Sequence, residues 1–291
     1  MSLSSRHRTA EICFEELGVP ALCVAKGPEL AAISVGRVTA LVVDIGGHET
    51  TCTPIVDGAA VFRSHGSSRL AGSSISLILE KQLNQLGETL VPLCAMRHNR
   101  MQPTSPLYQL RREDLARDIC ESVCRVHETP TSPKNQPPAE YTLPDGRILS
   151  VGTERFDVGE WYFSSTSLHS NHVALQSLVL STLSGMDPDY HKELIRNVVL
   201  TGGGSCLSGL PERFENELRV MARNSDALSI SNQAHRLAVL SGTVSERKYG
   251  TWTGGSILGS MGSHTQLWMS RAEYDEHGAA LISKKGLNYV W

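Results

Sequence analysis

Two glycine-rich turns carry the strongest chemical signal in this sequence. The first opens with Asp44 and contains Gly46 and Gly47, and the second is the run Gly202–Gly204. Such turns expose backbone N–H groups and let a phosphate approach closely. A carboxylate at the end of a strand can hold Mg²⁺ through water. The turns therefore predict phosphate and magnesium chemistry, with a left-handed glycine turn and a plain turn aspartate as the alternatives.

Other chemistries have less support. No GxxxxGK[ST], HExxH or GxSxG motif occurs, so P-loop, zincin and α/β-hydrolase activities have no motif behind them. His48 lies beside the first turn, where a solvated loop histidine is the favoured interpretation. Cys120 and Cys124 could share one helical face and bind a metal, but no second ligand pair accompanies them, which favours packing. The seven cysteines form no CxxC pair and are expected to be reduced.

The elements that must position the first turn follow from hydrophobic periodicity. The β-branched run 38–44 predicts a buried strand, and Asp57-Gly58 between apolar runs predicts a hairpin. A helix is expected from about residue 71, because apolar residues then recur on one face, and a later helix shows the same pattern. Their apolar positions are Ile75, Ile78, Leu79, Leu83 and Leu86 in the first helix, and Leu115, Ile119 and Val123 in the second.

The second turn has a similar setting. The run 197–201 predicts a strand, and Leu210, Phe214 and Leu218 mark one face of a following helix, with Ser208 as a candidate N-cap. Ligands gather at the carboxyl ends of strands in α/β folds. The segment 128–138, ETPTSPKNQPP, predicts a surface loop.

Composition bounds the class of protein. The chain has 291 residues, a net charge of −3, 40% hydrophobic residues and 20% charged residues, which predicts a globular, soluble protein. Nothing in this charge predicts strong nonspecific binding to nucleic acid or to an anionic membrane. No signal peptide or apolar run of about 18 residues is recognised, so an intracellular protein without membrane contact is expected.

Six segments, in order, closely resemble actin and actin-related proteins. They are Leu41–Gly47, Thr53–Gly58, Val198–Gly204, Glu246–Tyr249, Trp252–Gly259 and Gln266–Glu276. The resemblance implies the α/β, actin-like (ribonuclease H-like) ATPase fold, mainly the second half of its usual two-half architecture. Residues 1–37 and 246–291 would be a remnant of the first subdomain, 38–70 and 175–245 the inner lobe, and 71–174 the outer lobe. About a hundred residues of the family's N-terminal portion, including its first phosphate hairpin, have no counterpart.

The resemblance also implies a nucleotide site. Asp44 and Gly46 match the second phosphate loop, with Asp44 as the tentative Mg²⁺ ligand through water, and Gly202, Gly203 and Gly204 match the loop near the sugar and phosphates. Arg117, Glu121 and Lys248 match residues on the adenosine side. The cofactor implied is ATP or ADP with Mg²⁺, with loss of the nucleotide as the alternative.

Four positions depart from the family pattern. Gly47 replaces the second phosphate-loop aspartate, His48 the glycine after it, Gly27 the glutamine that positions the attacking water, and Cys120 an adenosine-side lysine. Phosphoryl transfer depends on positioned water, metal and charge stabilisation. A chain without these groups is expected to be no enzyme, although it can still bind nucleotide.

Within the family, the segments 36–46, 53–58 and 90–93 look more like the nuclear class found in chromatin-remodelling and histone-acetyltransferase complexes than like conventional actin. That class implies an assembly subunit in the nucleus, docked on a scaffold helix, paired with actin, and linked to nucleic acid only through chromatin. The alternatives are a cytoplasmic, cytoskeletal or filament-capping subunit of the dynein-activator type, and an active actin-fold ATPase.

Overall fold

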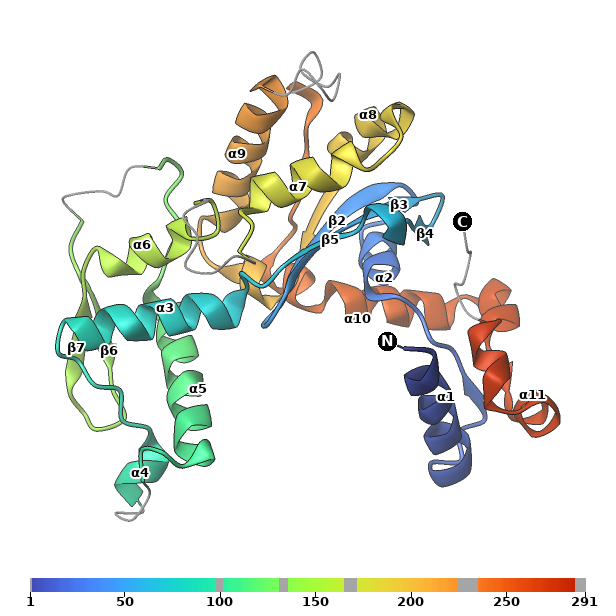
Figure 1. The fold of residues 1–291 in the computed structure, drawn as a ribbon, viewed down its shortest axis with the longest axis horizontal. Coiled ribbons are helices and arrows are strands. Elements are labelled where there is room, and N and C mark those ends of the chain that lie inside the picture. The colour runs from blue at the N-terminus through green and yellow to red at the C-terminus, as the bar shows by residue number, and fades with distance from the viewer. Residues whose placement is uncertain (1, 98–101, 131–135, 165–171, 225–234, 286–291) are drawn as a thin grey trace.

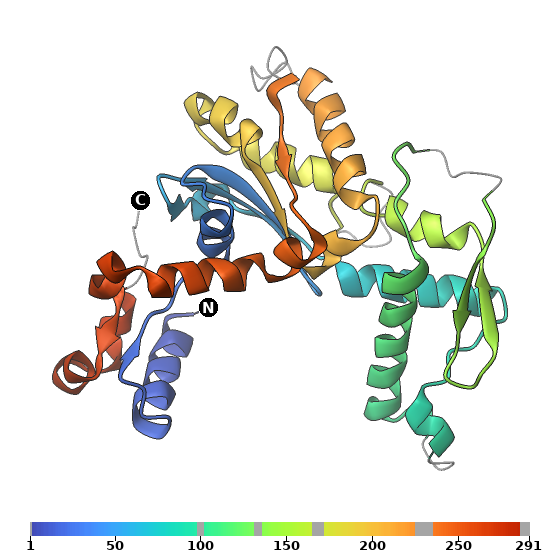
Figure 2. The ribbon, with the colours of Figure 1, turned by 180° about the vertical axis from the view of Figure 1, so that it is seen from behind.

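The computed structural model describes residues 2–97, 102–130, 136–164, 172–224 and 235–285. A central sheet carries helices on both faces, an outer group of helices and a hairpin extends to one side, and elements from the two ends of the chain pack together on the other (Figures 1 and 2). The mixture of strands and helices confirms the α/β class.

The central sheet runs in the order β4-β3-β2-β8-β9, with β5 paired to β3. Strand β2 lies antiparallel to β3 and parallel to β8, so Asp44 of β2 is the neighbour of Thr201 of β8. The carboxyl ends of β2 and β8, with their glycine turns, therefore meet at one edge of the sheet. The bounds are β2 Ala40–Ile45, β3 Thr50–Val56, β4 Ala59–Ala60, β5 Gly66–Ser68, β8 Val198–Thr201 and β9 Val239–Leu240.

Alternation along β2 decides which helices cover each face of the sheet. Leu41 and Val43 join the large core under α7 (Leu175–Ser184), α8 (Pro188–Arg196) and α9 (Leu210–Asn224). Ala40 and Val42 instead pack with Ala31 of α2 (Gly27–Ser34), beside which lies α10 (Val244–Ser260). Both faces are buried, which explains the unbroken apolar run of the strand.

The predicted hairpin is confirmed. Asp57 and Gly58 connect β3 to β4 with φ of 50° and 80°. Positive φ at both central residues matches the strand twist, and aspartate followed by glycine is well suited to that conformation.

The outer group is built on α3 (Gly72–Gln85) and α5 (Pro106–Val123), whose predicted apolar faces are buried except at Leu86. Leu86 is 60% exposed because it caps the end of α3. Cys120 and Cys124 are buried free thiols, which confirms packing. No group of three metal-binding side chains occurs in the described part of the chain. The group also contains α4 Leu93–Arg97, β6 Ala139–Thr142, β7 Ile148–Val151 and α6 Glu154–Glu160.

A buried arginine joins the outer group to the sheet's helices. Both terminal nitrogens of Arg213, on α9, donate to the carboxylate of Glu160, on α6, at 2.7 and 2.9 Å. Its Nε donates to Glu217 at 2.8 Å, and the guanidinium lies 4.8 Å from the centre of the Phe163 ring. Because these groups satisfy its charge, the arginine can be buried there and can fix α6 against α9.

The two ends of the chain form a third cluster. Phe14 stacks on Tyr274 with ring centroids 4.6 Å apart, and Met269 and Ile282 complete the apolar contact. The division of the chain into the three units given above remains our proposal. The elements here are α1 Leu3–Glu11, a π-helical turn Ile12–Glu16, β1 Ala21–Leu22, β10 Met269–Ser270, α11 Arg271–His277 and the 3₁₀ turn Ala279–Ser283.

Two further expectations have mixed outcomes. Ser208 is not the cap of α9, because the helix starts at Leu210 and Ser208 instead accepts a hydrogen bond from Arg125 at 3.4 Å. In the predicted loop 128–138, residues 131–135 lie outside the described residues, and the described remainder has no helix or strand. No helix in the described ranges is long and apolar enough to cross a membrane.

Candidate functional site

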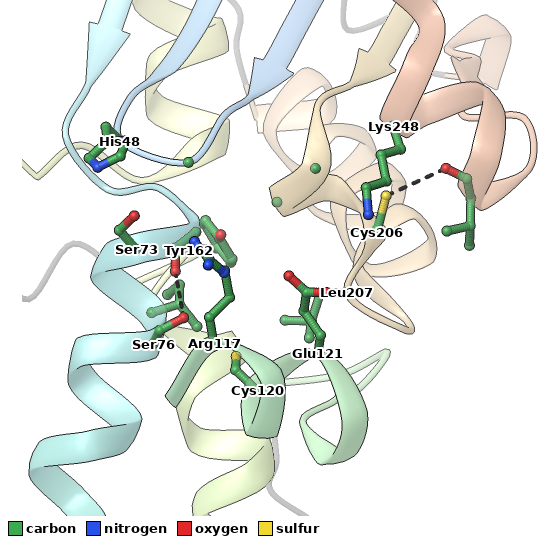
Figure 3. A pocket seen from close by; sticks show the side chains of 16 residues that line it. His48, Ser73, Ser76, Arg117, Cys120, Glu121, Tyr162, Cys206, Leu207 and Lys248 are labelled. Carbon is green, nitrogen blue, oxygen red and sulfur yellow. Dashed lines mark hydrogen bonds between the residues drawn. The ribbon is translucent and has the colours of Figure 1, made fainter. Parts of the chain in front are cut away.

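A cavity of about 340 Å³ opens where the turns after β2 and β8 approach α3, α5 and α10. Five of the eight predicted site residues line it, namely Arg117, Glu121, Gly203, Gly204 and Lys248. Figure 3 shows the side chains of Arg117, Glu121 and Lys248 at the cavity. Asp44, Gly46 and Gly202 lie outside the lining. The structure thus brings both glycine turns and the predicted charged residues to one place, although their role in binding remains a prediction.

Two glycines of the second turn are required by close packing. Gly202 has a φ of 91°, and a Cβ added there would lie 2.2 Å from Oδ1 of Asp44. A Cβ at Gly204 would lie 2.6 Å from the side chain of Ile45. Gly203, by contrast, is exposed, and a Cβ there would meet nothing within 4 Å. Gly203 is therefore free to face a ligand, whereas Gly202 serves the turn itself.

The first turn is fastened to the start of α3. Gly72 and Ser73 donate their N–H groups to the carbonyl oxygens of Gly46 and Gly47, at 3.1 and 2.7 Å, and the N–H of Gly46 donates to Glu49 at 3.0 Å. The bonds from Gly72 and Ser73 satisfy two backbone N–H groups that the N-terminus of α3 would otherwise leave without an intrahelical partner. They fix the turn beside the cavity and leave the N–H of Gly46 directed back into the turn.

Three charged side chains reach the cavity from opposite walls. Arg117 and Glu121 lie four residues apart on α5, which places them on one helical face, and Lys248 extends from α10 on the other side (Figure 3). Arg117 pairs with Asp114 on the preceding turn of α5, and Nζ of Lys248 lies 5.9 Å from the centre of the Tyr249 ring. All three side chains belong to exposed residues, so they can turn toward a polar ligand.

Several lining residues escaped the sequence analysis. Ser73 and Ser76 enter from α3, and Tyr162 lies behind them with its pKa raised by burial. Cys206 lies in the 3₁₀ turn Gly203–Cys206, with Sγ 3.5 Å from the carbonyl oxygen of Val244. The hydrophobic periodicity of the sequence does not distinguish such lining residues from other residues. The glycine at position 72, just before Ser73, was the one available sign that the start of α3 approaches another backbone.

Three of the four departures from the family pattern, Gly47, His48 and Cys120, line the cavity. His48 is exposed and lies on the lining beside Gly47, so the solvated histidine is also a cavity residue. Cys120 supplies a thiol to the cavity wall. Its pKa is lowered, mainly by a hydrogen bond with the side chain of Cys124. Gly27 begins α2 near Thr251 of α10 and does not line the cavity.

The donors present do not form a strong Mg²⁺ site. Burial raises the pKa of Asp44, and its Oδ1 packs against Gly202. Among the described lining residues, Glu121 is the one carboxylate, and it shares the cavity with two cations. Mg²⁺ prefers carboxylate, phosphate and water oxygens in near-octahedral geometry. Asp44 could contribute through water, but no carboxylate from the two turns faces the cavity.

The sheet topology and the pair of glycine turns define an actin-like nucleotide fold, and comparison with known proteins agrees. The model of the family described as "Actin" matches residues 2–287, so the chain belongs to the actin family. The actin-like ATPase fold is thereby confirmed.

Among characterised relatives, Actin-related protein 4 of Arabidopsis thaliana is 34% identical over 96% of this chain and 68% of that protein. Actin-related protein 4 of Neurospora crassa is 30% identical over 98% of this chain and 66% of that protein. Actin-like protein 7A of Rattus norvegicus is 30% identical over 97% of this chain and 58% of that protein. The chain is thus an actin-related protein.

Proposed function

We propose that this chain is a nucleotide-holding, non-hydrolysing assembly subunit of a nuclear complex that remodels chromatin or modifies histones. The observation that carries the nucleotide part is the cavity, which gathers Arg117, Glu121 and Lys248 around the turn containing Gly203 and Gly204. A partly enclosed, largely apolar pocket with a few charged side chains, at the carboxyl ends of strands, is the usual place for a ligand in such a fold.

The absence of hydrolysis is inferred from two positions. Gly27 has no side chain with which to orient an attacking water, and Gly47 offers no carboxylate to the phosphate end. Because phosphoryl transfer depends on such positioning, the nucleotide would persist and stabilise the fold, as any ligand that binds only the native state does.

The nuclear assignment is supported by similarity to proteins named Actin-related protein 4 in plants and fungi. The subunit would dock on a scaffold helix, alongside actin, and would reach nucleic acid only through chromatin. The net charge of −3 agrees with indirect contact, since a direct phosphate-binding surface is usually basic.

Single-turnover phosphate release tests the catalytic part. Protein in excess over γ-labelled ATP should release no phosphate above a heat-denatured control, while filter binding shows retained nucleotide. Release at a rate that scales with protein concentration would contradict the proposal.

The assembly part is tested separately with a fluorescent, affinity-tagged chain in living cells. We expect nuclear fluorescence and co-purification, in fixed ratio, with actin and with subunits of a chromatin complex identified by mass spectrometry. A cytoplasmic chain that co-sediments with actin filaments would instead support the filament-capping alternative.

A further inference from the structure

The charges around the cavity determine whether a nucleotide binds with or without a divalent cation. The lining side chains carry two cations, Arg117 and Lys248, against the single carboxylate of Glu121 in the described lining. Arg117 also contacts Asp114, which does not line the cavity. Within a Debye length of about 8–10 Å, these groups act together on a bound anion.

The part of the cavity beside the two glycine turns, where the phosphates of a nucleotide would lie, lacks negatively charged side chains. Oδ1 of Asp44 packs against the Gly202 backbone, and Asp44 does not line the cavity. Gly47 does line it but has no side chain. A divalent cation carried in by a nucleotide would therefore meet little compensating negative charge from the protein, whereas the free polyphosphate would meet two cations.

We propose that the cavity binds a nucleoside diphosphate or triphosphate as the metal-free anion, its charge balanced by Arg117 and Lys248 and not by Mg²⁺. This inference rests on the nucleotide binding proposed above. It differs from that proposal in one measurable property, which is the dependence of affinity on the divalent cation.

Gly47 allows the missing charge to be restored. A Cβ added at this position meets nothing within 4 Å, and the backbone there is not in the left-handed region. The Cβ of an aspartate or asparagine therefore fits without overlap. Gly47→Asp adds a carboxylate to the cavity wall, and Gly47→Asn adds the same shape without the charge.

The experiment is calorimetric titration of the full chain with ADP, in EDTA and then in excess Mg²⁺. The wild-type dissociation constant in EDTA should equal that in Mg²⁺ or be lower, within about threefold, because the free anion keeps its full attraction to the cations. Gly47→Asp should bind at least about tenfold more weakly in EDTA and recover in Mg²⁺, since a carboxylate repels bare phosphate. Gly47→Asn should show the same dissociation constants as the wild type in both buffers.

The outcomes separate the two proposals. If the wild type binds only with Mg²⁺, or at least about tenfold more tightly with it, nucleotide binding stands and the metal-free inference is overturned. If the wild type binds ADP in neither buffer, the proposed function itself fails. Identical behaviour of Gly47→Asp and Gly47→Asn would overturn the charge argument at this turn. The wild-type comparison needs no variant, and thermal melts serve as the control that both variants are folded.

Discussion

The two glycine turns that flank the cavity differ in how they are held. The turn after β8 is tied to α10, because Arg247 accepts hydrogen bonds at its carbonyl oxygen from the N–H of Gly202 and the hydroxyl of Thr201, at 3.0 and 2.9 Å. The turn after β2 is tied to α3, where Gly46 and Gly47 accept two N–H groups. The cavity therefore lies between one turn fixed to α10 and one fixed to the outer group.

The turns also differ in how much room they leave. In the second, Gly202 and Gly204 are packed against β2, and Gly203 alone is open. In the first, Gly46 is close to the carbonyl oxygen of Glu49, while Gly47 is open. A run of glycines thus combines positions that the fold requires with positions that a ligand could use, and sequence alone does not separate them.

Breaking the second turn should have the largest effect. Gly202→Ala places a methyl group against Asp44 at a φ of 91°, so strain and overlap together should lower the free energy of unfolding by about 3 kcal/mol. Urea unfolding followed by circular dichroism measures it. The matched control is Gly203→Ala, which has open space, and an equal loss in both variants would contradict the packing argument.

Loosening the segment that leads into α10 should cost less. The buried guanidinium of Arg247 donates to the carbonyl oxygens of Ser241 and Gly242 at 3.0 and 2.8 Å. Arg247→Met leaves both acceptors without this donor, with an expected loss of about 2 kcal/mol in urea unfolding. Arg63→Met, at an exposed position, serves as control, and equal stability of the two variants would mean that the Arg247 side chain does not hold Ser241 and Gly242 in place.

The pH dependence of Asp44 gives a smaller effect. Because burial raises its pKa above the usual 3.8, the folded state binds the proton more tightly than the unfolded state, and the ionised carboxylate destabilises the fold. Asp44→Asn should raise the melting temperature slightly at pH 7, and the gain should vanish as the pH falls through the native pKa toward 3.8. Melts across this range test it, and a loss of stability at pH 7 would show that the carboxylate has a stabilising partner.

The smallest effect is expected at the open position of the first turn. Gly47→Ala meets no atom within 4 Å and reduces the freedom of the unfolded chain. Its free energy of unfolding should stay unchanged or rise by up to about 1 kcal/mol. A clear destabilisation in urea would mean that this turn is as tightly constrained as the second.

Sequence patterns predicted the parts of the fold that depend on local periodicity. The run 40–45, the Asp57-Gly58 hairpin and the apolar face of α9 follow from alternation, turn chemistry and helical spacing. The cap at Ser208 was wrong because Gly209, with a φ of 82°, is the residue that fits beside Val126. That approach of distant segments has no local signature.

The candidate site was predictable only in part. Arg117, Glu121 and Lys248 were assigned by resemblance, whereas Ser76 and Tyr162 line the cavity because α3 and the segment after α6 fold against α5. Asp44 could be placed at a strand end, but the packing of its carboxylate under Gly202 depends on the register between β2 and β8.

The central claim is that this cavity binds nucleotide, and calorimetric titration with ADP of the wild type, Lys248→Met and the exposed control Lys192→Met tests it most directly. We predict saturable binding at one site, about tenfold weaker in Lys248→Met because a charged contact is lost while its apolar stem is kept, and unchanged in Lys192→Met. No saturable binding, or the same affinity in all three proteins, would contradict the account.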